Sequence, residues 1–403
     1  MHLSVKNIGK LSEADIDLNG ITVIAGENDT GKSTIGKVLY SVFNIFNNID
    51  KQVEEERKRF ISRYLINVYD YPMEELVKNI INSKDDETIK NLLLNTNITI
   101  RNNDINLDEV VDIIKDSLLI SENNIKKMII KRRLSAEFNE NINNIYSEDK
   151  AEINLTIKSQ NIAIYILNND VVNIFGKDEF SLNNNVIYID DPNILDEIEF
   201  YKHFYNNYLK TREIQLVNTL FPNKQEGRII EEIFINQKLD DIMGKINSVC
   251  SGSIIEDKIN YNYKIVNSDK VINIKNLSTG LKSFVILKTL LQNGAITYNG
   301  TIILDEPEIH LHPQWQLLFA EIIVLLQKEF KLHVLLTTHS PYFIEAIETY
   351  SEKYSIANNC NYYLAENYGE SASIFDVTNN TEEIYKKLAK PFQELENARY
   401  SDD

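Results

Sequence analysis

Residues 26–34, with the sequence Gly-Glu-Asn-Asp-Thr-Gly-Lys-Ser-Thr, have the residue types and spacing of a loop that wraps nucleotide phosphates. Glycines in this pattern let successive backbone N–H groups turn toward a phosphate, and the following helix adds the positive end of its dipole. Lys32 is placed to reach the β- and γ-phosphates, and the Ser33 hydroxyl to hold Mg²⁺. The sequence therefore predicts a phosphate-binding loop, whose contacts come from Gly26, Asn28, Asp29, Thr30, Gly31, Lys32, Ser33 and Thr34.

The elements on either side of this loop are the ones that must position it. Residues 21–25 are a β-branched run suited to a buried strand, and residues 34–46 have the apolar period of a helix. A glycine-rich loop can match the pattern by chance. The strand before it and the helix after it favour the functional interpretation.

A second acidic motif ends another apolar strand. Residues 301–304 prefer the strand conformation and are followed at once by Asp305, Glu306 and Pro307. At the carboxyl end of a parallel strand beside the phosphate loop, Asp305 can hold Mg²⁺, usually through water. Glu306 is placed to polarise the attacking water as a general base. Alone this motif is weak, but together with the phosphate loop it indicates nucleotide hydrolysis.

Two further segments fit the same chemistry. Ser278 and Gly280 begin a helix, where they predict either a simple N-cap above a core stripe or a second anion site aimed at a γ-phosphate. His339 follows the apolar strand 334–338, and Pro341 opens the next helix. A histidine at a strand end is often structural; beside the other motifs, we expect His339 to sense the γ-phosphate.

Composition sets the broad class. The 403 residues are 43% hydrophobic and 25% charged, as in a soluble globular protein with a sizeable core. The net charge of −18 argues against general binding of polyanions, although residues 126–133 hold a basic cluster that fits either a nucleic-acid patch or a solvated helix face.

Two cysteines without a C-x-x-C pair predict no disulfide or zinc site. Without a signal-peptide core or a long apolar run, we expect a cytoplasmic protein with no membrane contact.

The sequence predicts one α/β head that is interrupted by two helical insertions. We expect an N-terminal part of the head at residues 1–44, a helical insertion at 45–150 and a β-rich part at 151–192. A second helical insertion covers 193–250, and the C-terminal part of the head covers 251–403. The predicted fold is a doubly wound α/β P-loop head with an N-terminal antiparallel β-subdomain and two helical insertions.

The order of the four motifs resembles the ABC-type ATPases of the structural-maintenance-of-chromosomes (SMC) and RecF group. Residues 305–313, Asp-Glu-Pro-Glu-Ile-His-Leu-His-Pro, are most similar to the overcoming-lysogenization-defect ATPases and their relatives in antiphage defence. The resemblance covers residues 1–44 and about 262–350 well, and hardly reaches the insertions.

The resemblance implies a Mg²⁺-dependent ATPase with Lys32, Glu306 and His339 as catalytic residues and with Ser33 and Asp305 as metal ligands. Ser278 and Gly280 would form the signature that completes the ATP site of a second copy, in a head-to-tail dimer or a larger assembly. Relatives in Septu-type and PARIS-type systems imply a sensor that controls a separately encoded effector, such as a nuclease or toxin.

Departures from the family pattern are also informative. Asp29 stands where these loops usually carry glycine, which predicts a tighter backbone and slower hydrolysis. Thr279 replaces the second glycine of the transporter signature. No Q-loop glutamine is evident, and Asn141 is the candidate for that position.

Other functions compete with this interpretation. A transporter ATPase is disfavoured by the long separation of Lys32 from Ser278. A fused Toprim nuclease is disfavoured because residues 340–403 lack the required Glu and Asp-x-Asp set. An SMC- or RecF-like DNA-repair ATPase stays open, although the acidity weighs against it. A degenerate structural domain is disfavoured by the intact Lys32, Asp305, Glu306 and His339.

Overall fold

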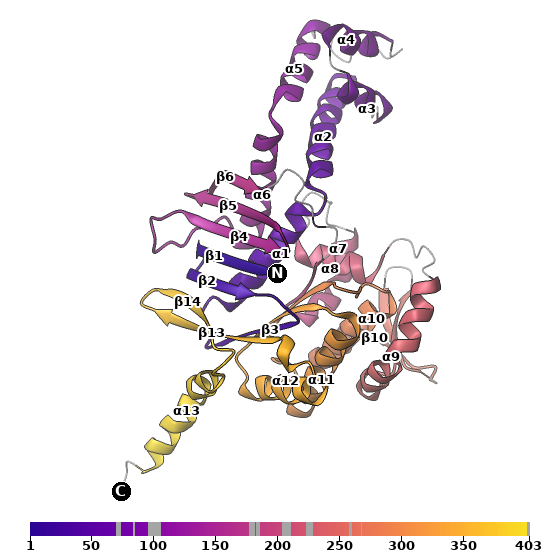
Figure 1. Cartoon of the computed structure of the whole chain (residues 1–403). Coiled ribbons are helices and arrows are strands. Elements are labelled where there is room, and N and C mark those ends of the chain that lie inside the picture. Colours follow the sequence, from indigo (N-terminus) through magenta and orange to yellow (C-terminus); the bar gives the residue numbers. More distant parts are fainter. Residues whose placement is uncertain are drawn as a thin grey trace. The chain divides into compact units, whose positions relative to one another are not determined.

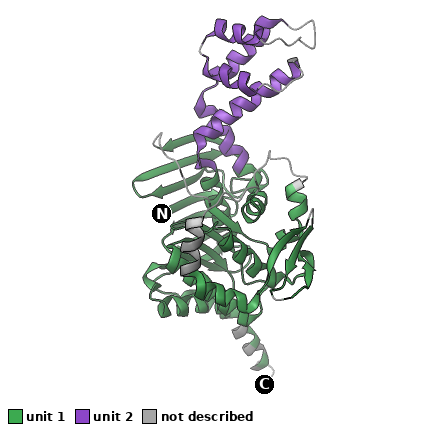
Figure 2. Cartoon of the chain, turned by 90° about the vertical axis from the view of Figure 1, so that its right-hand side faces the viewer, with its two compact units in different colours: residues 1–44, 134–180, 184–403 green, residues 45–133, 181–183 purple. Residues whose placement is uncertain are grey.

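The computed structural model describes residues 1–69, 74–83, 85–95, 106–176, 182, 186–203, 211–222, 229–257, 260–266 and 268–400. The chain divides into two compact units, coloured separately in Figure 2. The larger unit contains Met1–Asn44, Leu134–Phe180 and Asn184–Asp403, and the smaller contains Ile45–Arg133 and Ser181–Asn183. Each unit has its own hydrophobic core.

The larger unit is built on one sheet of eleven strands, in the order β6-β5-β4-β1-β2-β14-β13-β3-β12-β11-β7 (Figure 1). Five neighbouring strands pair in parallel. All six residues of β3 (Ile21–Gly26) are buried, which explains its mainly apolar sequence. Because the strands are parallel, their carboxyl ends share one edge of the sheet. The five strands are β13 (Cys360–Tyr368), β3 (Ile21–Gly26), β12 (His333–Thr338), β11 (Thr301–Asp305) and β7 (Val186–Ile189).

The rest of the sheet is mainly antiparallel and confirms the predicted N-terminal β-subdomain. Strand β14 pairs antiparallel with β13 and parallel with β2, so it joins the two halves into one sheet. Strand β1 pairs with β4, which brings together two segments that the helical insertion separates in sequence. These strands are β1 (His2–Ile8), β2 (Leu11–Asp17), β4 (Ala151–Ile157), β5 (Gln160–Leu167), β6 (Asp170–Gly176) and β14 (Ser371–Asp376).

The helices of the larger unit complete the expected α/β class. Phe284 packs edge-on against Trp315 and Phe319, with ring centroids 5.7 and 5.3 Å away, and so fixes one helix on the next. Proline occupies the first turn of two of the helices, where its missing N–H costs nothing. The helices are α1 (Lys32–Phe46), α7 (Ile198–His203), α8 (Arg212–Leu220), α9 (Ile229–Val249), α10 (Thr279–Gln292), α11 (Pro313–Phe330), α12 (Pro341–Lys353) and α13 (Glu382–Tyr400).

Short elements fill the connections of this unit. A separate three-stranded sheet has the order β10-β9-β8. Its strands and the 3₁₀ helices are β8 (Ser253–Asp257), β9 (Asn260–Lys264), β10 (Val271–Asn273), η1 (Pro192–Asp196), η2 (Ile274–Asn276) and η3 (Ala357–Asn359).

The smaller unit is helical in the part that the structure describes. Its core is formed by Ile61, Leu65, Ile80, Val110 and Ile114, which are buried on facing helices. The guanidinium of Arg57 donates to the carbonyl oxygens at the end of α5, which would otherwise lack partners. The helices are α2 (Ile49–Tyr69), α3 (Glu74–Asn82), α4 (Asp86–Leu94), α5 (Leu107–Leu119) and α6 (Glu122–Phe138), whose last residues belong to the larger unit.

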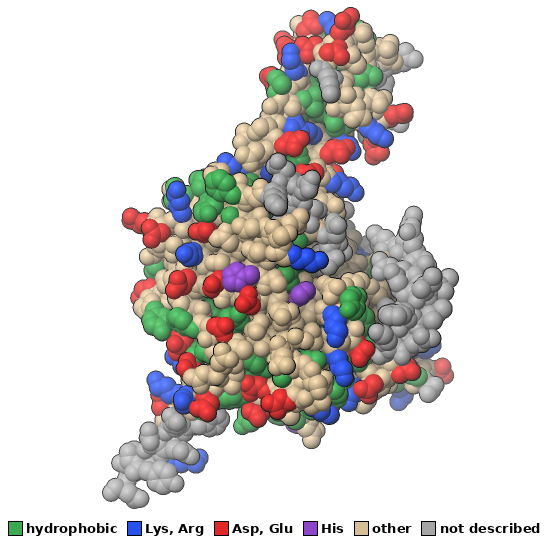
Figure 3. Space-filling model, viewed as in Figure 1, with side chains coloured by type: hydrophobic (Ala, Val, Ile, Leu, Met, Phe, Trp, Pro, Cys, Tyr) green, Lys and Arg blue, Asp and Glu red, His purple; other side chains and the backbone are tan. Residues whose placement is uncertain are grey.

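The basic cluster of residues 126–133 lies on α6 and is partly neutralised by α2. Lys126 Nζ lies 2.8 Å from Asp50 Oδ1, and Arg132 Nη1 lies 3.4 Å from Glu56 Oε2. On the face drawn in Figure 3, acidic and basic side chains of the described residues are interspersed and form no continuous basic patch. These contacts support the solvated-helix interpretation of the cluster over a nucleic-acid patch.

None of the helices that the structure describes is both long enough and apolar enough to cross a membrane.

Candidate active site

The phosphate loop joins β3 to α1 through backbone that only glycine accommodates easily. Gly31 has φ 77°, and a Cβ there would lie 2.6 Å from Cδ2 of Leu11. A Cβ on Gly26 would lie 2.6 Å from the carbonyl oxygen of Ala365 on β13. The loop therefore turns closely against two neighbouring strands and delivers Lys32 as the first residue of α1.

Asp29 adopts a left-handed backbone conformation at the tip of this loop, with φ 60°. Aspartate tolerates this conformation better than most residues with a side chain, because its carboxylate is short and polar. That carboxylate is largely exposed, and Oδ2 lies 2.5 Å from Lys10 Nζ. The loop thus keeps a glycine-like geometry at position 29, while adding a negative charge that Lys10 balances.

Lys32 is held inside the loop and is only 3% exposed. Its Nζ donates to the carbonyl oxygen of Glu27 at 2.7 Å and lies 3.3 Å from Oε1 of Glu306. A buried ammonium requires such partners. Lys32 comes from the loop after β3 and Glu306 from the end of β11. The two side chains are therefore in direct contact.

Three hydroxyl groups surround the carboxylate of Asp305 at the end of β11. Ser33 Oγ donates to Oδ1 at 3.0 Å, and Thr337 Oγ1 donates to the same oxygen. Tyr188, on the neighbouring strand β7, donates its hydroxyl to Oδ2 at 2.9 Å. The predicted metal ligands Ser33 and Asp305 are therefore in direct contact, and the orientation of the carboxylate is fixed from both sides.

Glu306 follows Asp305 in a left-handed conformation with φ 49°, which is uncommon for a residue with a side chain. Its backbone N–H donates to Thr337 Oγ1 at 3.1 Å. Backbone strain of this kind concentrates at functional sites because the surroundings must maintain it. Here the turn aims the Glu306 side chain at Lys32.

His339 stands at the end of β12, beside two carboxylates. Its Nδ1 lies 3.6 Å from Oε2 of Glu306 and 3.8 Å from Oε1 of Glu308, but makes no hydrogen bond. Glu308 is 2% exposed and accepts hydrogen bonds from the Thr338 hydroxyl and the His339 N–H. Burial raises the pKa of the Glu308 carboxyl, against the opposing effect of these hydrogen bonds.

The signature segment is not part of this cluster within one chain. Ser278 is exposed and stands at the N-cap of α10, but its side chain makes no capping hydrogen bond. No hydrogen bond or ion pair of the described residues connects Ser278 or Gly280 to the phosphate loop. The helix is instead fixed to η1, by Lys282 with Asp196 at 2.7 Å and by Thr279 with Asn193 at 3.4 Å.

The donor atoms near the phosphate loop fit Mg²⁺ bound together with a nucleotide. Serine and carboxylate oxygens are hard ligands, and Mg²⁺ is commonly held by one or two carboxylates plus substrate phosphates. Among the described residues no cluster of three His, Cys, Asp or Glu side chains could hold a metal without help. Ser33 and Asp305 would therefore supply the protein ligands, and the phosphates would supply others.

A family profile described as "AAA domain, putative AbiEii toxin, Type IV TA system" (AAA_21) matches residues 21–345. This span includes the phosphate loop, the Asp305–Glu306 strand end and His339. The chain belongs to the AAA_21 family.

Two curated relatives of this AAA_21 chain share shorter segments with it. The Septu protein PtuA of Bacillus thuringiensis is 34% identical over 113 residues, which are 25% of this chain and 27% of PtuA. The protein named "Retron Vc95 probable ATPase" of Vibrio cholerae serotype O1 biovar El Tor is 32% identical over 110 residues, which are 24% of this chain and 20% of the relative. The match spans about a quarter of the length of PtuA and less of the retron protein.

Solved structures with similarity over most of the chain include SMC heads at low identity. The SMC head domain from Thermotoga maritima is 10% identical with a TM-score of 0.42, covering 93% of this chain and 98% of that one. The SmcHead bound to the C-winged helix domain of ScpA is 11% identical with a TM-score of 0.47, covering 93% and 97%.

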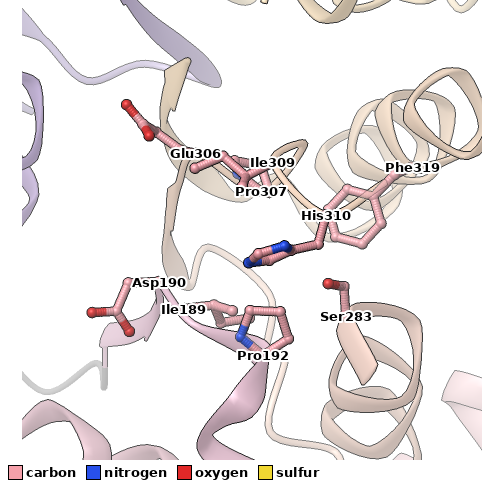
Figure 4. Close-up of a pocket in the computed structure, with 9 residues that line it drawn as sticks. All are labelled: Ile189, Asp190, Pro192, Ser283, Glu306, Pro307, Ile309, His310 and Phe319. Carbon is pink, nitrogen blue, oxygen red and sulfur yellow. The ribbon is translucent and has the colours of Figure 1, made fainter. Parts of the chain in front are cut away.

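A small cavity of about 40 Å³ lies beside the site of the AAA_21 chain (Figure 4). It is bordered by β7, the turn after β11 and the signature helix α10, which contributes Ser283. In Figure 4 the carboxylate of Glu306 points away from the ring of His310. The space exceeds the roughly 10–15 Å³ that one water needs, and Asp190, Ser283 and His310 offer polar partners.

Two residues of the AAA_21 chain that contact Asp305, Tyr188 and Thr337, were not predicted from the sequence. Each lies within an apolar strand, and the apolar pattern of a strand does not show which distant side chain a hydroxyl contacts. Asn141, the candidate for the Q-loop position, lies just after α6 and donates to the carbonyl oxygen of Asn139 at 3.4 Å. No hydrogen bond in the described part of the chain joins Asn141 to the phosphate loop.

Proposed function

We propose that this protein is a Mg²⁺-dependent ATPase whose active site is shared between two copies. The observation that carries the proposal is the convergence of Lys32, Ser33, Asp305, Glu306 and His339 at the carboxyl ends of three adjacent parallel strands. Open parallel sheets bind their ligands at this edge.

Each residue in this cluster has a chemical role in phosphoryl transfer to water. Lys32 would bind the β- and γ-phosphates, and Ser33 and Asp305 would hold Mg²⁺, which neutralises charge on the phosphates when bound. Glu306 would accept a proton from the attacking water, and His339 would contact the γ-phosphate. Catalysis then depends mainly on positioning and on electrostatic stabilisation.

Completion of the site by a second copy is supported by the state of the signature segment. Ser278 is exposed, its hydroxyl is not used to cap α10, and it does not contact its own phosphate loop. These features suit a helix start that binds the γ-phosphate of a facing subunit in a head-to-tail dimer. Larger assemblies can be built from such dimers.

A role in antiphage defence is supported by the similarity to PtuA of a Septu system and to a retron ATPase. We propose a cytoplasmic sensor that controls a separately encoded effector, such as a nuclease or a toxin. Direct action on DNA, as in a repair ATPase, is less favoured because the net charge is −18 and the basic cluster on α6 is partly paired.

A mixing experiment tests the shared site. Lys32→Ala removes the phosphate-binding cation, and Ser278→Arg blocks the signature; each variant alone should hydrolyse ATP at least about 100-fold more slowly than the parent. A dimer of one copy of each has one site with both defects and one intact site. Mixing the two inactive proteins should therefore restore ATPase activity to a substantial fraction of the parent rate.

Failure of this rescue, with both variants folded and able to exchange subunits, would contradict the shared site. If Ser278→Arg alone retained the parent rate, the signature role would be wrong while an ATPase acting as a single copy would stand.

Purification of the natively expressed protein, followed by mass measurement of the complex, tests whether a separately encoded effector is bound. Salt-sensitive binding of the isolated protein to duplex DNA would instead favour the repair ATPase.

A further inference from the structure

The two oxygens of the Asp305 carboxylate accept hydroxyl groups from different elements. Oδ1 accepts from Ser33 of the phosphate loop, whereas Oδ2 accepts the hydroxyl of Tyr188 on β7 at 2.9 Å. Tyr188 is 3% exposed. A tyrosine hydroxyl carries its proton at neutral pH, so it donates a hydrogen bond to the Asp305 carboxylate, which can only accept.

Two aromatic and cationic contacts hold the ring of Tyr188. Tyr40 of α1 packs edge-on, with ring centroids 5.8 Å apart and planes at 82°. The guanidinium carbon of Arg212 lies 5.0 Å from the Tyr188 ring centroid, within the range of a cation–π contact. The ring is thereby fixed between α1, which carries Lys32 and Ser33, and α8, which begins at Arg212.

Arg212 is in turn fixed by carboxylates from three parts of the larger unit. Its Nη1 donates to Glu137 at 2.8 Å, and its Nε lies 3.0 Å from Asp190 and 3.3 Å from Glu213. Burial alone would lower the pKa of Arg212, but Asp190 and Glu137 outweigh it and raise the pKa. Because these carboxylates balance its charge, the main effect of the guanidinium on Tyr188 is to hold the ring in place.

We propose that Tyr188 is a positioning residue for the metal-ligating carboxylate of Asp305, and that Arg212 holds Tyr188 in place, so that helix α8 influences metal-dependent nucleotide binding. This inference rests on the proposed function, because it assigns the metal to Ser33 and Asp305. It names residues outside all four sequence motifs.

The physical reason is the strict geometry of Mg²⁺. The ion requires oxygens at roughly 2.0–2.1 Å in near-octahedral positions, so a carboxylate that rotates freely binds it less well. Partners that orient metal ligands typically change metal affinity by about 10- to 100-fold when they are removed. The Tyr188 hydroxyl donates to Oδ2 of Asp305, so it can orient this carboxylate as a metal ligand.

The test measures nucleotide affinity by calorimetry, with a non-hydrolysable ATP analogue, in the presence of Mg²⁺ and in the presence of EDTA. The ratio of the two dissociation constants gives the gain that the metal supplies. Tyr188→Phe keeps the ring and removes one hydroxyl, and it should reduce this ratio about 10-fold while leaving the affinity in EDTA unchanged.

Tyr40→Phe is the matched control. Tyr40 is a buried tyrosine in the same aromatic pair, but its hydroxyl donates to Gln215 Oε1 at 2.7 Å and not to Asp305. It should keep the parent ratio, even if both variants lose similar thermal stability. A purely structural role for Tyr188 predicts the same ratio in both variants, and that result would overturn the proposal.

Arg212→Lys tests the second part of the inference. Lysine keeps the charge but cannot bridge Glu137 and Asp190 as a guanidinium does. The variant should also reduce the Mg²⁺ gain, and the double variant with Tyr188→Phe should be no worse than Tyr188→Phe alone. Fully additive losses would overturn the action of Arg212 through Tyr188.

The outcomes also separate this inference from the proposed function. If the parent protein gains affinity with Mg²⁺ and Tyr188→Phe gains equally, only the positioning role is overturned. If the parent protein binds the analogue equally well with Mg²⁺ and with EDTA, both the metal site and the positioning role are overturned.

Discussion

Lys32 Nζ lies 3.3 Å from Glu306 Oε1, so the cation assigned to the phosphates and the carboxylate assigned to the attacking water form an ion pair. Both groups are shielded, with Lys32 3% and Glu306 21% exposed at the side chain. A triphosphate must therefore compete with Glu306 for the same ammonium. Under the proposed function, phosphate binding would therefore release the carboxylate that is assigned to hydrolysis.

Glu306→Gln removes that competition while preserving the shape of the side chain. We expect ATP to bind a few-fold more tightly, and hydrolysis to fall by about 10²- to 10⁴-fold because the general base is lost. With ATP and Mg²⁺, the variant should accumulate as a dimer in size-exclusion chromatography with light scattering. Hydrolysis at the parent rate would show that the role of Glu306 is wrong.

The Asp29–Lys10 pair at the loop tip predicts two substitutions with opposite effects on ATP affinity. Asp29→Asn keeps a residue that tolerates the left-handed conformation but removes a negative charge near the phosphates, so ATP should bind about 2- to 5-fold more tightly. Lys10→Met leaves the Asp29 charge unbalanced and should weaken binding by a similar factor.

Fluorescence titration with an ATP analogue at low and high salt measures both variants of this pair. The two effects should shrink at high ionic strength, because the Asp29 carboxylate is mostly exposed and its charge is screened. Changes of the same sign in both variants, or changes that salt does not affect, would argue against electrostatic control by this pair.

Glu308→Gln tests the consequence of burying a carboxylate beside His339. The pKa of Glu308 is raised by burial above its ordinary value of 4.5, so the folded chain retains this proton at pH values where the unfolded chain releases it. Stability contributed by Glu308 therefore falls as pH rises above about 4.5, by roughly 1.4 kcal/mol for each unit between the folded and unfolded pKa values.

The glutamine can still accept from Thr338 and from the His339 N–H, but it carries no charge to bury. Chemical unfolding should show Glu308→Gln to be more stable than the parent at pH 8, with the difference vanishing near pH 4. His339 is the titratable group facing Glu308, so the double variant with His339→Gln serves as the control. A difference that is constant from pH 4 to pH 8 would contradict the sign assigned here.

Local sequence pattern was sufficient to predict which segments meet at the site. The buried runs before Gly26, Asp305 and His339 each end at the start of a motif, and parallel strands bring such ends together. Asp305 therefore had to lie near Ser33 once both strands joined one sheet. The same logic does not place Ser278, which begins helix α10 and does not end a parallel strand.

Contacts between distant segments could not be read from the pattern. The pairing of β14 with β2 joins residues from opposite ends of the chain, and periodicity carries no information on pairing partners. Tyr188 illustrates the same limit at the site. The sequence around a tyrosine in a buried strand looks the same whether its hydroxyl donates to a carboxylate such as Asp305 or to a backbone carbonyl.

Two helical glycines provide a matched test of the signature segment. A Cβ on Gly280, at the start of α10, would lie 2.6 Å from the carbonyl oxygen of His310, and so would push α10 away from the turn after β11. A Cβ on Gly244, in α9, has nothing within 4 Å. Backbone atoms cannot yield as the end of a flexible side chain can, so Gly280→Ala should lower stability by about 1–3 kcal/mol.

Gly244→Ala should instead raise stability by about 0.5–1 kcal/mol, because alanine restricts the unfolded chain and favours the helix. Thermal unfolding of both variants checks the two signs. Gly280→Ala should also slow ATP hydrolysis while leaving nucleotide binding to the phosphate loop intact, because Gly280 does not contact that loop in its own chain. If Gly280→Ala were as stable and as active as Gly244→Ala, the close contact between the signature helix and His310 would not be required for function.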